Sequence, residues 1–204
     1  MSSNADFVHV FEPGTDTARP PVLLLHGTGG DENDLLPFGR LVAPGASLLS
    51  PRGQVLENGM ARFFRRLAEG VFDEGDLRGR TDDLADFIRA AQARYGIAAP
   101  VALGFSNGAN VAASLLLRHP GLLRGAALLR AMPPFRDPPA ARLDGTKALL
   151  LSGAADPIVP AEDSERLAWI LQDAGAAVKH HLLPLGHSLS QMDVALTRDW
   201  MLAL

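Results

Sequence analysis

Six short apolar segments constrain the fold of this chain more than any other feature of its sequence. Each is flanked by glycine or proline and shows little alternation of apolar and polar residues. In chain order they read PVLLLHG, ASLLSP, VALGF, GAALLRA, KALLLSG and AAVKHHLLP. Segments of this kind are typical of strands that are buried on both faces, as in a parallel sheet. A further strand is predicted at a sheet edge, over residues 8–11.

Amphipathic helices are predicted between these strands. In TDDLADFIRAAQARYG, Leu84 and Ile88 belong to one apolar face with helical spacing, Thr81 is the expected N-cap and Gly96 the expected stop. AEDSERLAWILQDAG repeats the pattern and ends at Gly175. Strands that alternate with helices predict an α/β fold with helices on both faces of the sheet.

Composition narrows the classes of protein further. A chain of 204 residues, 47% of them hydrophobic, is long enough for one domain with a large core, and we expect a single domain over residues 1–204. The net charge of −4 disfavours nucleic-acid and anionic-membrane partners. The chain has no cysteine, which excludes disulfides and a thiolate nucleophile. We see neither a transmembrane run nor a secretory signal, and we expect a cytoplasmic location.

A serine between two glycines stands where a predicted strand gives way to a predicted helix. Gly104-Phe105-Ser106-Asn107-Gly108 reads G-x-S-x-G, directly after VALGF. In a nucleophile elbow, small flanking residues let strand and helix approach, and the turn exposes the serine hydroxyl at the helix N-terminus. Five residues of this kind also arise by chance in ordinary turns. The position between a buried strand and an apolar helix favours the elbow.

A serine nucleophile needs a base and a carboxylate that orients the base. His187, in LPLGHSLS, follows the last predicted strand at the same sheet edge as Ser106, although a loop histidine is usually only polar surface. Asp156 follows KALLLSG, where its other interpretation is an Asx turn before Pro157. Asp137 and Asp144 are weaker rivals. We expect Ser106, Asp156 and His187 to form a catalytic triad.

An oxyanion hole requires two N–H donors near the serine. We expect one from the main chain of Asn107 and the other from Thr28, in the glycine-rich segment LLLHGTGGDENDL. His26 is expected to brace this loop by hydrogen bonding. A phosphate-binding loop is disfavoured because neither phosphate motif is present and the nearby acidic residues would repel phosphate. The same acidic residues lack the spacing of a metal site, and we expect no metal.

Residues 52–80 are the least regular part of the chain. We expect a partly helical surface insert whose aromatic side chains fill the core, with Arg52 pinning the loop. The alternative is a wall over the substrate pocket, because the insert leaves the sheet at the edge that carries Ser106. Arg62, Phe63 and Met132 are our candidates for that pocket. No insertion is long enough to form a large cap domain.

Several segments together resemble the small carboxylesterases of the phospholipase/carboxylesterase family, which are relatives of acyl-protein thioesterases and dienelactone hydrolases. They are LLLHGTGGDENDLLPF, SPRGQVLENGMARFFRRLAEGVFDEGDL, GFSNGAN, SGAADPIVP and GHSLS. The resemblance implies an α/β-hydrolase fold with a mostly parallel central sheet of about seven strands, the triad and oxyanion hole given above, no cofactor, and often a homodimer. The family elbow often carries Gln where this chain has Asn107.

These observations predict a serine carboxylesterase that hydrolyses small or medium esters through an acyl-enzyme. A thioesterase or lysophospholipase of the same family would use the same residues. A protein of this fold that binds a ligand without turnover is the alternative from a different class. The expected partner is a small-molecule ester, without nucleic acid or membrane.

Overall fold

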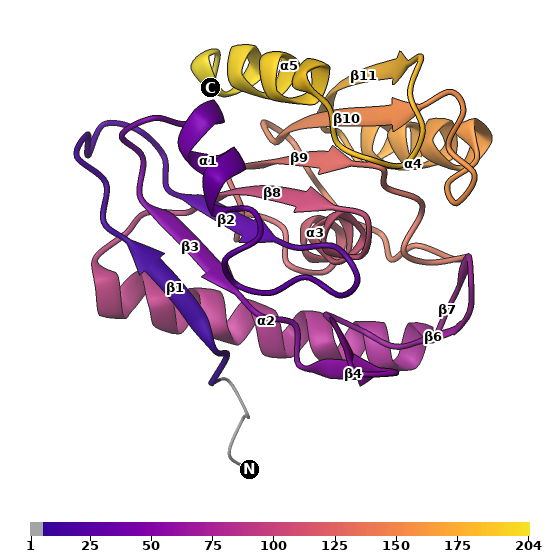
Figure 1. Ribbon diagram of the computed structural model, residues 1–204, viewed down its shortest axis with the longest axis horizontal. Coiled ribbons are helices and arrows are strands. Elements are labelled where there is room, and N and C mark those ends of the chain that lie inside the picture. The colour runs from indigo at the N-terminus through magenta and orange to yellow at the C-terminus, as the bar shows by residue number, and fades with distance from the viewer. Residues whose placement is uncertain (1–5) are drawn as a thin grey trace.

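The computed structural model describes residues 6–204, in which one seven-stranded sheet lies between two layers of helices (Figure 1). The strand order is β1-β3-β2-β8-β9-β10-β11, and only β1, at the edge, runs antiparallel to its neighbour. The mostly parallel sheet of about seven strands and the edge position of the first strand are therefore confirmed. The strands are β1 (His9–Glu12), β2 (Val22–Leu25), β3 (Leu48–Pro51), β8 (Val101–Phe105), β9 (Gly125–Leu129), β10 (Lys147–Gly153) and β11 (Ala177–Leu183).

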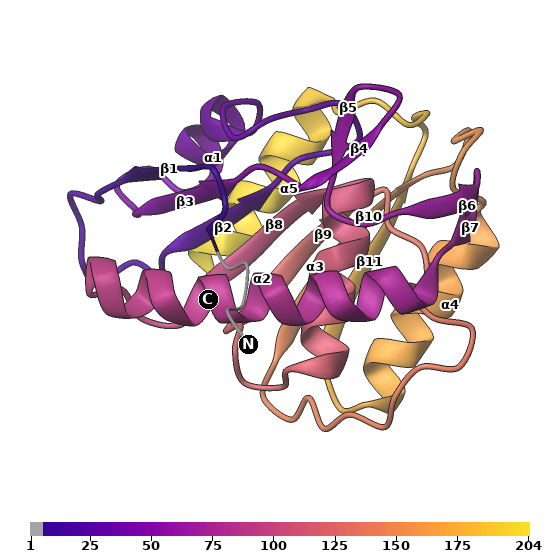
Figure 2. The same ribbon diagram turned by 90° about the horizontal axis from the view of Figure 1, so that it is seen from below.

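Helices cover both faces of this sheet (Figures 1 and 2). Helices α1 and α5 lie on one face, and α2, α3 and α4 lie on the other. Across residues 6–204, no helix combines the length and apolarity needed to cross a lipid bilayer. The helices are α1 (Leu36–Val42), α2 (Glu74–Tyr95), α3 (Asn107–Arg118), α4 (Ala161–Asp173) and α5 (Gln191–Leu202).

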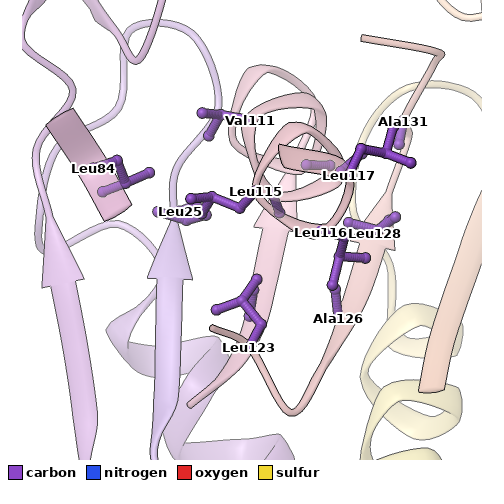
Figure 3. Packing of buried hydrophobic residues seen from close by; sticks show 14 of the residues in the cluster. Leu25, Leu84, Val111, Leu115, Leu116, Leu117, Leu123, Ala126, Leu128 and Ala131 are labelled. Carbon is purple, nitrogen blue, oxygen red and sulfur yellow. The ribbon is translucent and has the colours of Figure 1, made fainter. Parts of the chain in front are cut away.

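The two helical layers explain why the apolar segments do not alternate. Side chains of a strand point to opposite faces in turn. In β2, Leu23 and Leu25 pack in the core beneath α2, α3 and α4, whereas Val22 and Leu24 pack in the core beneath α1 and α5. Figure 3 shows the first of these cores, with Leu25 beside residues of α3. Both faces of a central strand must therefore be apolar.

Helix α2 begins earlier than the sequence predicts. Its N-cap is Asp73, whose carboxylate accepts a hydrogen bond from the main chain of Asp76 at 3.0 Å. Thr81 is not the N-cap but lies inside the helix, where its hydroxyl donates to the Leu77 carbonyl at 2.6 Å. The extra turns are charged on the solvent side and bury Leu77, so a purely apolar pattern misses them. The stop at Gly96 is confirmed by its left-handed φ of 64°.

Two β-hairpins precede α2 in the segment that was expected to be partly helical. They are built from β4 (Val55–Glu57) with β5 (Met60–Arg62), and from β6 (Arg66–Ala68) with β7 (Val71–Phe72). The segment becomes helical only from Glu74 onward, so that expectation is correct for its last turns alone. Phe63 and Phe64 are buried, as expected. The described part of the chain contains no large cap domain.

The strand order reverses direction beside β2. From β2 the chain passes to β3 on one side, and β8 then pairs with the other side of β2. The carboxyl ends of β2 and β8 are neighbours, with Leu25 opposite Gly104. Ligands of open α/β sheets bind at such a reversal, outside the carboxyl ends of the strands. The loops that follow β2 and β8 therefore lie at the expected place for a site.

Candidate active site

Ser106 occupies a strained turn between β8 and α3. Its φ of 52° and ψ of −114° are values that a residue with a side chain rarely adopts. Its own N–H donates to the Leu129 carbonyl at 2.9 Å, which ties the turn to β9. Asn107 is the first residue of α3, so its N–H has no acceptor within the helix.

The two glycines of the elbow are required by close packing. A Cβ on Gly108 would lie 2.0 Å from the Leu25 carbonyl oxygen, and one on Gly104 would lie 2.6 Å from the Ala109 Cα. Helix α3 therefore approaches β2 and β8 more closely than any side chain would permit. The physical reason for the glycines that the sequence suggested is confirmed by these contacts.

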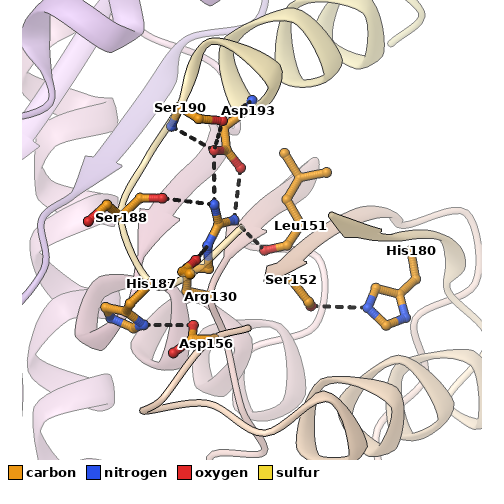
Figure 4. Close-up of polar contacts among 10 residues, drawn as sticks. Arg130, Leu151, Ser152, Asp156, His180, His187, Ser188, Ser190 and Asp193 are labelled. Atoms are coloured by element: carbon orange, nitrogen blue, oxygen red, sulfur yellow. Dashed lines mark hydrogen bonds and ion pairs between the residues drawn. The ribbon is translucent and has the colours of Figure 1, made fainter. Parts of the chain in front are cut away.

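Ser106, His187 and Asp156 form a continuous chain of hydrogen bonds. The Ser106 hydroxyl lies 3.0 Å from His187 Nε2 and can donate to it, and His187 Nδ1 lies 2.8 Å from Asp156 Oδ2. The other oxygen of Asp156 accepts from the main-chain N–H groups of Ile158 and Val159, at 2.8 and 3.0 Å. The Asp156 side chain is fully buried, and that of His187 is 18% exposed. Figure 4 shows the contact between His187 and Asp156.

The loop after β2 is held from two sides. His26 Nδ1 lies 2.7 Å from the Gly27 carbonyl, and His26 Nε2 accepts from the Gly53 N–H at 2.9 Å. This pattern requires a neutral ring, and burial lowers the pKa of His26 accordingly. Arg52 forms an ion pair with Glu32 through two hydrogen bonds. The expected bracing by His26 and pinning by Arg52 are both present.

Arg62 connects the first hairpin to the same loop. Its Nη1 donates to the Thr28 hydroxyl at 2.6 Å, and its Nε donates to the Phe64 carbonyl at 3.1 Å. Glu57 lies 3.3 Å from the guanidinium, which is only 3% exposed. Burial lowers the pKa of Arg62, and the neighbouring charge of Arg66 lowers it further. The hairpin thus fixes the position of Thr28 beside the elbow.

A cavity of about 320 Å³ opens above Ser106 and His187. Arg62 and Met132, two of the three residues predicted for the pocket, lie in its wall, as do the predicted oxyanion-hole residues Thr28 and Asn107. The structure does not bring Phe63 to this wall. Its ring packs against His26 at a centroid distance of 4.7 Å, while its N–H donates to the Asn107 side chain. Wall residues that the sequence did not single out are Arg66, Glu69, Gly70, Phe72, Phe105, Asn110, Ile158 and Val159.

Within residues 6–204, no three His, Asp or Glu side chains gather in a group that could hold a metal ion. Two acidic residues of the loop after β2 have other partners. Glu32 pairs with Arg52, and the Asp31 carboxylate accepts from the Asn33 N–H at 2.7 Å.

Similar proteins share this arrangement of strands and helices. Residues 51–145 match the family model of the alpha/beta hydrolase fold. The chain is 45% identical to the putative hydrolase MhqD of Bacillus subtilis (strain 168) over 194 residues. The aligned region covers 94% of this chain and 96% of that protein. The chain belongs to the α/β-hydrolase family. The resemblance drawn from its motifs is thereby confirmed.

Two solved structures of carboxylesterases are close to this α/β-hydrolase. The Bacillus cereus carboxylesterase is 47% identical with a TM-score of 0.95, over 98% of this chain and 96% of that one. The Mesorhizobium loti carboxylesterase is 37% identical with a TM-score of 0.87, over 91% of this chain and 90% of that one.

One buried ion pair of this α/β-hydrolase was not predicted from the sequence. Arg130, directly after β9, forms a fully buried ion pair with Asp193 in the first turn of α5. The available signal was a single charged residue at the end of an apolar strand, in GAALLRA. A buried arginine is uncommon unless it is paired, and this one lies beside the loop that carries His187 (Figure 4).

Proposed function

We propose that the protein is a carboxylesterase with Ser106 as its nucleophile. The observation that carries the proposal is the hydrogen-bonded chain from Ser106 through His187 to Asp156, at the floor of a cavity. The solved carboxylesterases from Bacillus cereus and Mesorhizobium loti support the type of reaction. Ester hydrolysis by this chemistry needs no cofactor, and we propose none.

Acylation begins with attack of the Ser106 hydroxyl oxygen on the ester carbonyl carbon. His187 Nε2 takes the hydroxyl proton, and Asp156 stabilises the imidazolium that forms. The main-chain N–H groups of Thr28 and Asn107 are proposed to donate to the oxyanion of the tetrahedral intermediate. When the intermediate collapses, the C–O bond to the alcohol breaks and His187 returns the proton to the leaving alkoxide.

Deacylation repeats these steps with water as the nucleophile. His187 removes a proton from water, and the resulting hydroxide attacks the acyl-enzyme carbonyl. The second tetrahedral intermediate collapses with cleavage of the bond to Ser106, whose oxygen takes the proton back from His187. The carboxylic acid leaves and the enzyme is regenerated.

The cavity indicates the size of the substrate. A volume of about 320 Å³ is at the lower end of the range for small-molecule sites. Met132, Phe72, Ile158 and Val159 contribute apolar wall, and Arg62 contributes a buried cation. We propose small or medium esters as substrates. We also propose that residues 1–204 form a single domain. A homodimer and a cytoplasmic location stay predictions.

The deciding experiment compares p-nitrophenyl esters from acetate to palmitate with the wild type and Ser106→Ala. We expect hydrolysis of short esters and a loss of at least about 1000-fold in kcat for the variant. Ser114→Ala is the matched control, because Ser114 lies further along α3 and bonds Thr81. An active Ser106→Ala variant would exclude the mechanism. Preference for thioesters or long chains would favour the thioesterase or lysophospholipase alternative, and a wild type without turnover would favour a binding protein.

A further inference from the structure

Arg130 is the largest fully buried side chain of the described residues, and its backbone is strained. Its φ of 56° is left-handed although it carries a long side chain, and its N–H donates to the Leu151 carbonyl at 2.8 Å. This turn directs the guanidinium from the end of β9 across the end of β10, beneath the loop between β11 and α5 (Figure 4). Such strain persists only where the surroundings enforce it.

All five N–H donors of the Arg130 guanidinium have acceptors. Nε donates to the Gly186 carbonyl at 3.0 Å, and Nη2 donates to the Ser188 carbonyl at 3.0 Å. Nη1 donates to the Leu151 carbonyl at 3.0 Å. The remaining two donors form a bidentate pair with Asp193, at 2.8 and 2.9 Å. An arginine has five such donors in a rigid fork, so no N–H donor of the Arg130 guanidinium is left without an acceptor.

Two of these acceptors flank His187 on either side. The loop at residues 184–190 has no regular secondary structure, so its position depends on contacts of this kind. The other hydrogen bonds that hold this loop lie further from His187: the Leu185 N–H donates to Leu183, the Leu185 carbonyl accepts from Ala155, and Ser190 bonds to Asp193. Arg130 therefore supplies the contacts that bracket the histidine itself.

Asp193 holds the guanidinium in its orientation. Besides the two bonds from Arg130, its Oδ2 accepts from the N–H and the hydroxyl of Ser190, both at 2.8 Å. Asp193 is completely buried, as is Arg130, so neither charge is screened by solvent. A cap of α5 alone would need only Asp193 and Ser190. The bonds from Arg130 to Gly186 and Ser188 add nothing to that cap.

We infer that Arg130 is a positioning residue for His187, an inference that rests on the esterase function proposed above. By binding the carbonyls on both sides of His187, it fixes the loop so that Nε2 stays within reach of Ser106 and Nδ1 stays on Asp156. A displacement of about 1 Å at a catalytic group can cost about 100-fold in rate. Arg130 touches neither the substrate nor the reacting atoms.

Two variants separate positioning from stability. Arg130→Lys keeps the charge but cannot reach both carbonyls and both Asp193 oxygens at once. The double variant Arg130→Met/Asp193→Asn removes both buried charges together, which proteins tolerate better than losing one, and Asn can still accept from Ser190. Leu171→Ala is the matched control, because Leu171 is fully buried on α4 near the opposite end of the strands.

We expect kcat for p-nitrophenyl acetate to fall about 100-fold in both Arg130 variants, with KM little changed, when rates are normalised to folded enzyme. The rate at which a fluorophosphonate labels Ser106, followed by mass spectrometry, should fall in parallel. Leu171→Ala should lose stability and keep both rates.

Wild-type rates in folded Arg130→Lys or in the double variant would overturn the inference. Failure of both variants to fold would assign Arg130 a purely structural role and overturn it as well. If the wild type hydrolyses no ester, the proposed function fails, but fluorophosphonate labelling of Ser106 still reports on His187. The two failures are therefore distinguishable.

Discussion

Asp156 uses its two carboxylate oxygens for different contacts. Oδ1 accepts from the main chain of Ile158 and Val159, which is the Asx-type turn expected before Pro157. Oδ2 accepts from His187. The two interpretations of this residue are therefore compatible. The turn holds the carboxylate in a fixed orientation through Oδ1, so that Oδ2 faces the imidazole of His187.

Asp156→Asn separates these contacts at the scale of one residue. The amide oxygen can still accept from the turn, so the fold should persist, but the amide NH₂ cannot accept from His187 Nδ1–H. We expect kcat to fall by about 10⁴-fold with an unchanged circular-dichroism spectrum. Exposed Asp137→Asn, at one of the weaker rival carboxylates, should retain full activity. Comparable losses in both variants would contradict the assignment.

At the scale of elements, the junction of β8 and α3 depends on two glycines that have no side chain, Gly104 and Gly108. The left-handed φ of Ser106 turns the chain sharply, and Gly104 and Gly108 let the helix rest against β8 and β2. The helix N-terminus consequently points toward the hydroxyl of Ser106. Sequence and packing agree here, since the glycines that define the motif are also the positions where a Cβ would overlap backbone atoms.

Gly108→Ala tests this packing. A Cβ would lie 2.0 Å from the Leu25 carbonyl oxygen, so α3 must move away from β2. We expect a loss of about 1–3 kcal/mol in the free energy of unfolding and reduced esterase activity, measured by urea titration and p-nitrophenyl acetate hydrolysis. Gly79→Ala is the control: it lies in α2 with nothing within 4 Å of its Cβ, and should stabilise by about 0.5–1 kcal/mol. Equal stability of Gly108→Ala and wild type would refute the close-packing argument.

For the whole molecule, buried and paired ionisable groups set how stability depends on pH. Burial lowers the pKa of His26 and of His180, and the hydrogen bond from Arg52 lowers the pKa of Glu32. Each group binds its proton more weakly in the folded state than in the unfolded chain. Acid therefore favours unfolding, from about pH 6.5 downward through the histidines and from about pH 4.3 downward through the carboxylate.

Urea unfolding at about pH 8 and about pH 5.5 measures the histidine contribution. We expect the wild type to lose stability at the lower pH. His26→Gln should be less stable than wild type at the higher pH, because its hydrogen bonds to Gly27 and Gly53 are disturbed, but should lose less on acidification. Gln172→Ala, at an exposed and uncharged side chain of α4, is the control and should follow the wild type. Equal losses in wild type and His26→Gln would exclude His26 as a source of the acid sensitivity.

The sequence by itself determined which segments become strands of the central sheet and which chemically capable residues follow them. Apolar segments reveal burial on both faces, and the carboxyl ends of parallel strands share one edge. Ser106, Asp156 and His187 could therefore be placed at one edge of the sheet from the sequence, with Thr28 beside them. The elbow was readable because its glycines are a local requirement.

Only the tertiary structure decided the strand order, the early start of α2, the two hairpins and the cavity wall. It turned Phe63 toward His26 and brought Phe72 to the cavity instead. It also joined Arg130 to Asp193, 63 positions apart in the chain. Periodicity reports that a residue is buried, but not which distant residue it meets. Partners of that kind depend on the packing of whole elements, which no local pattern contains.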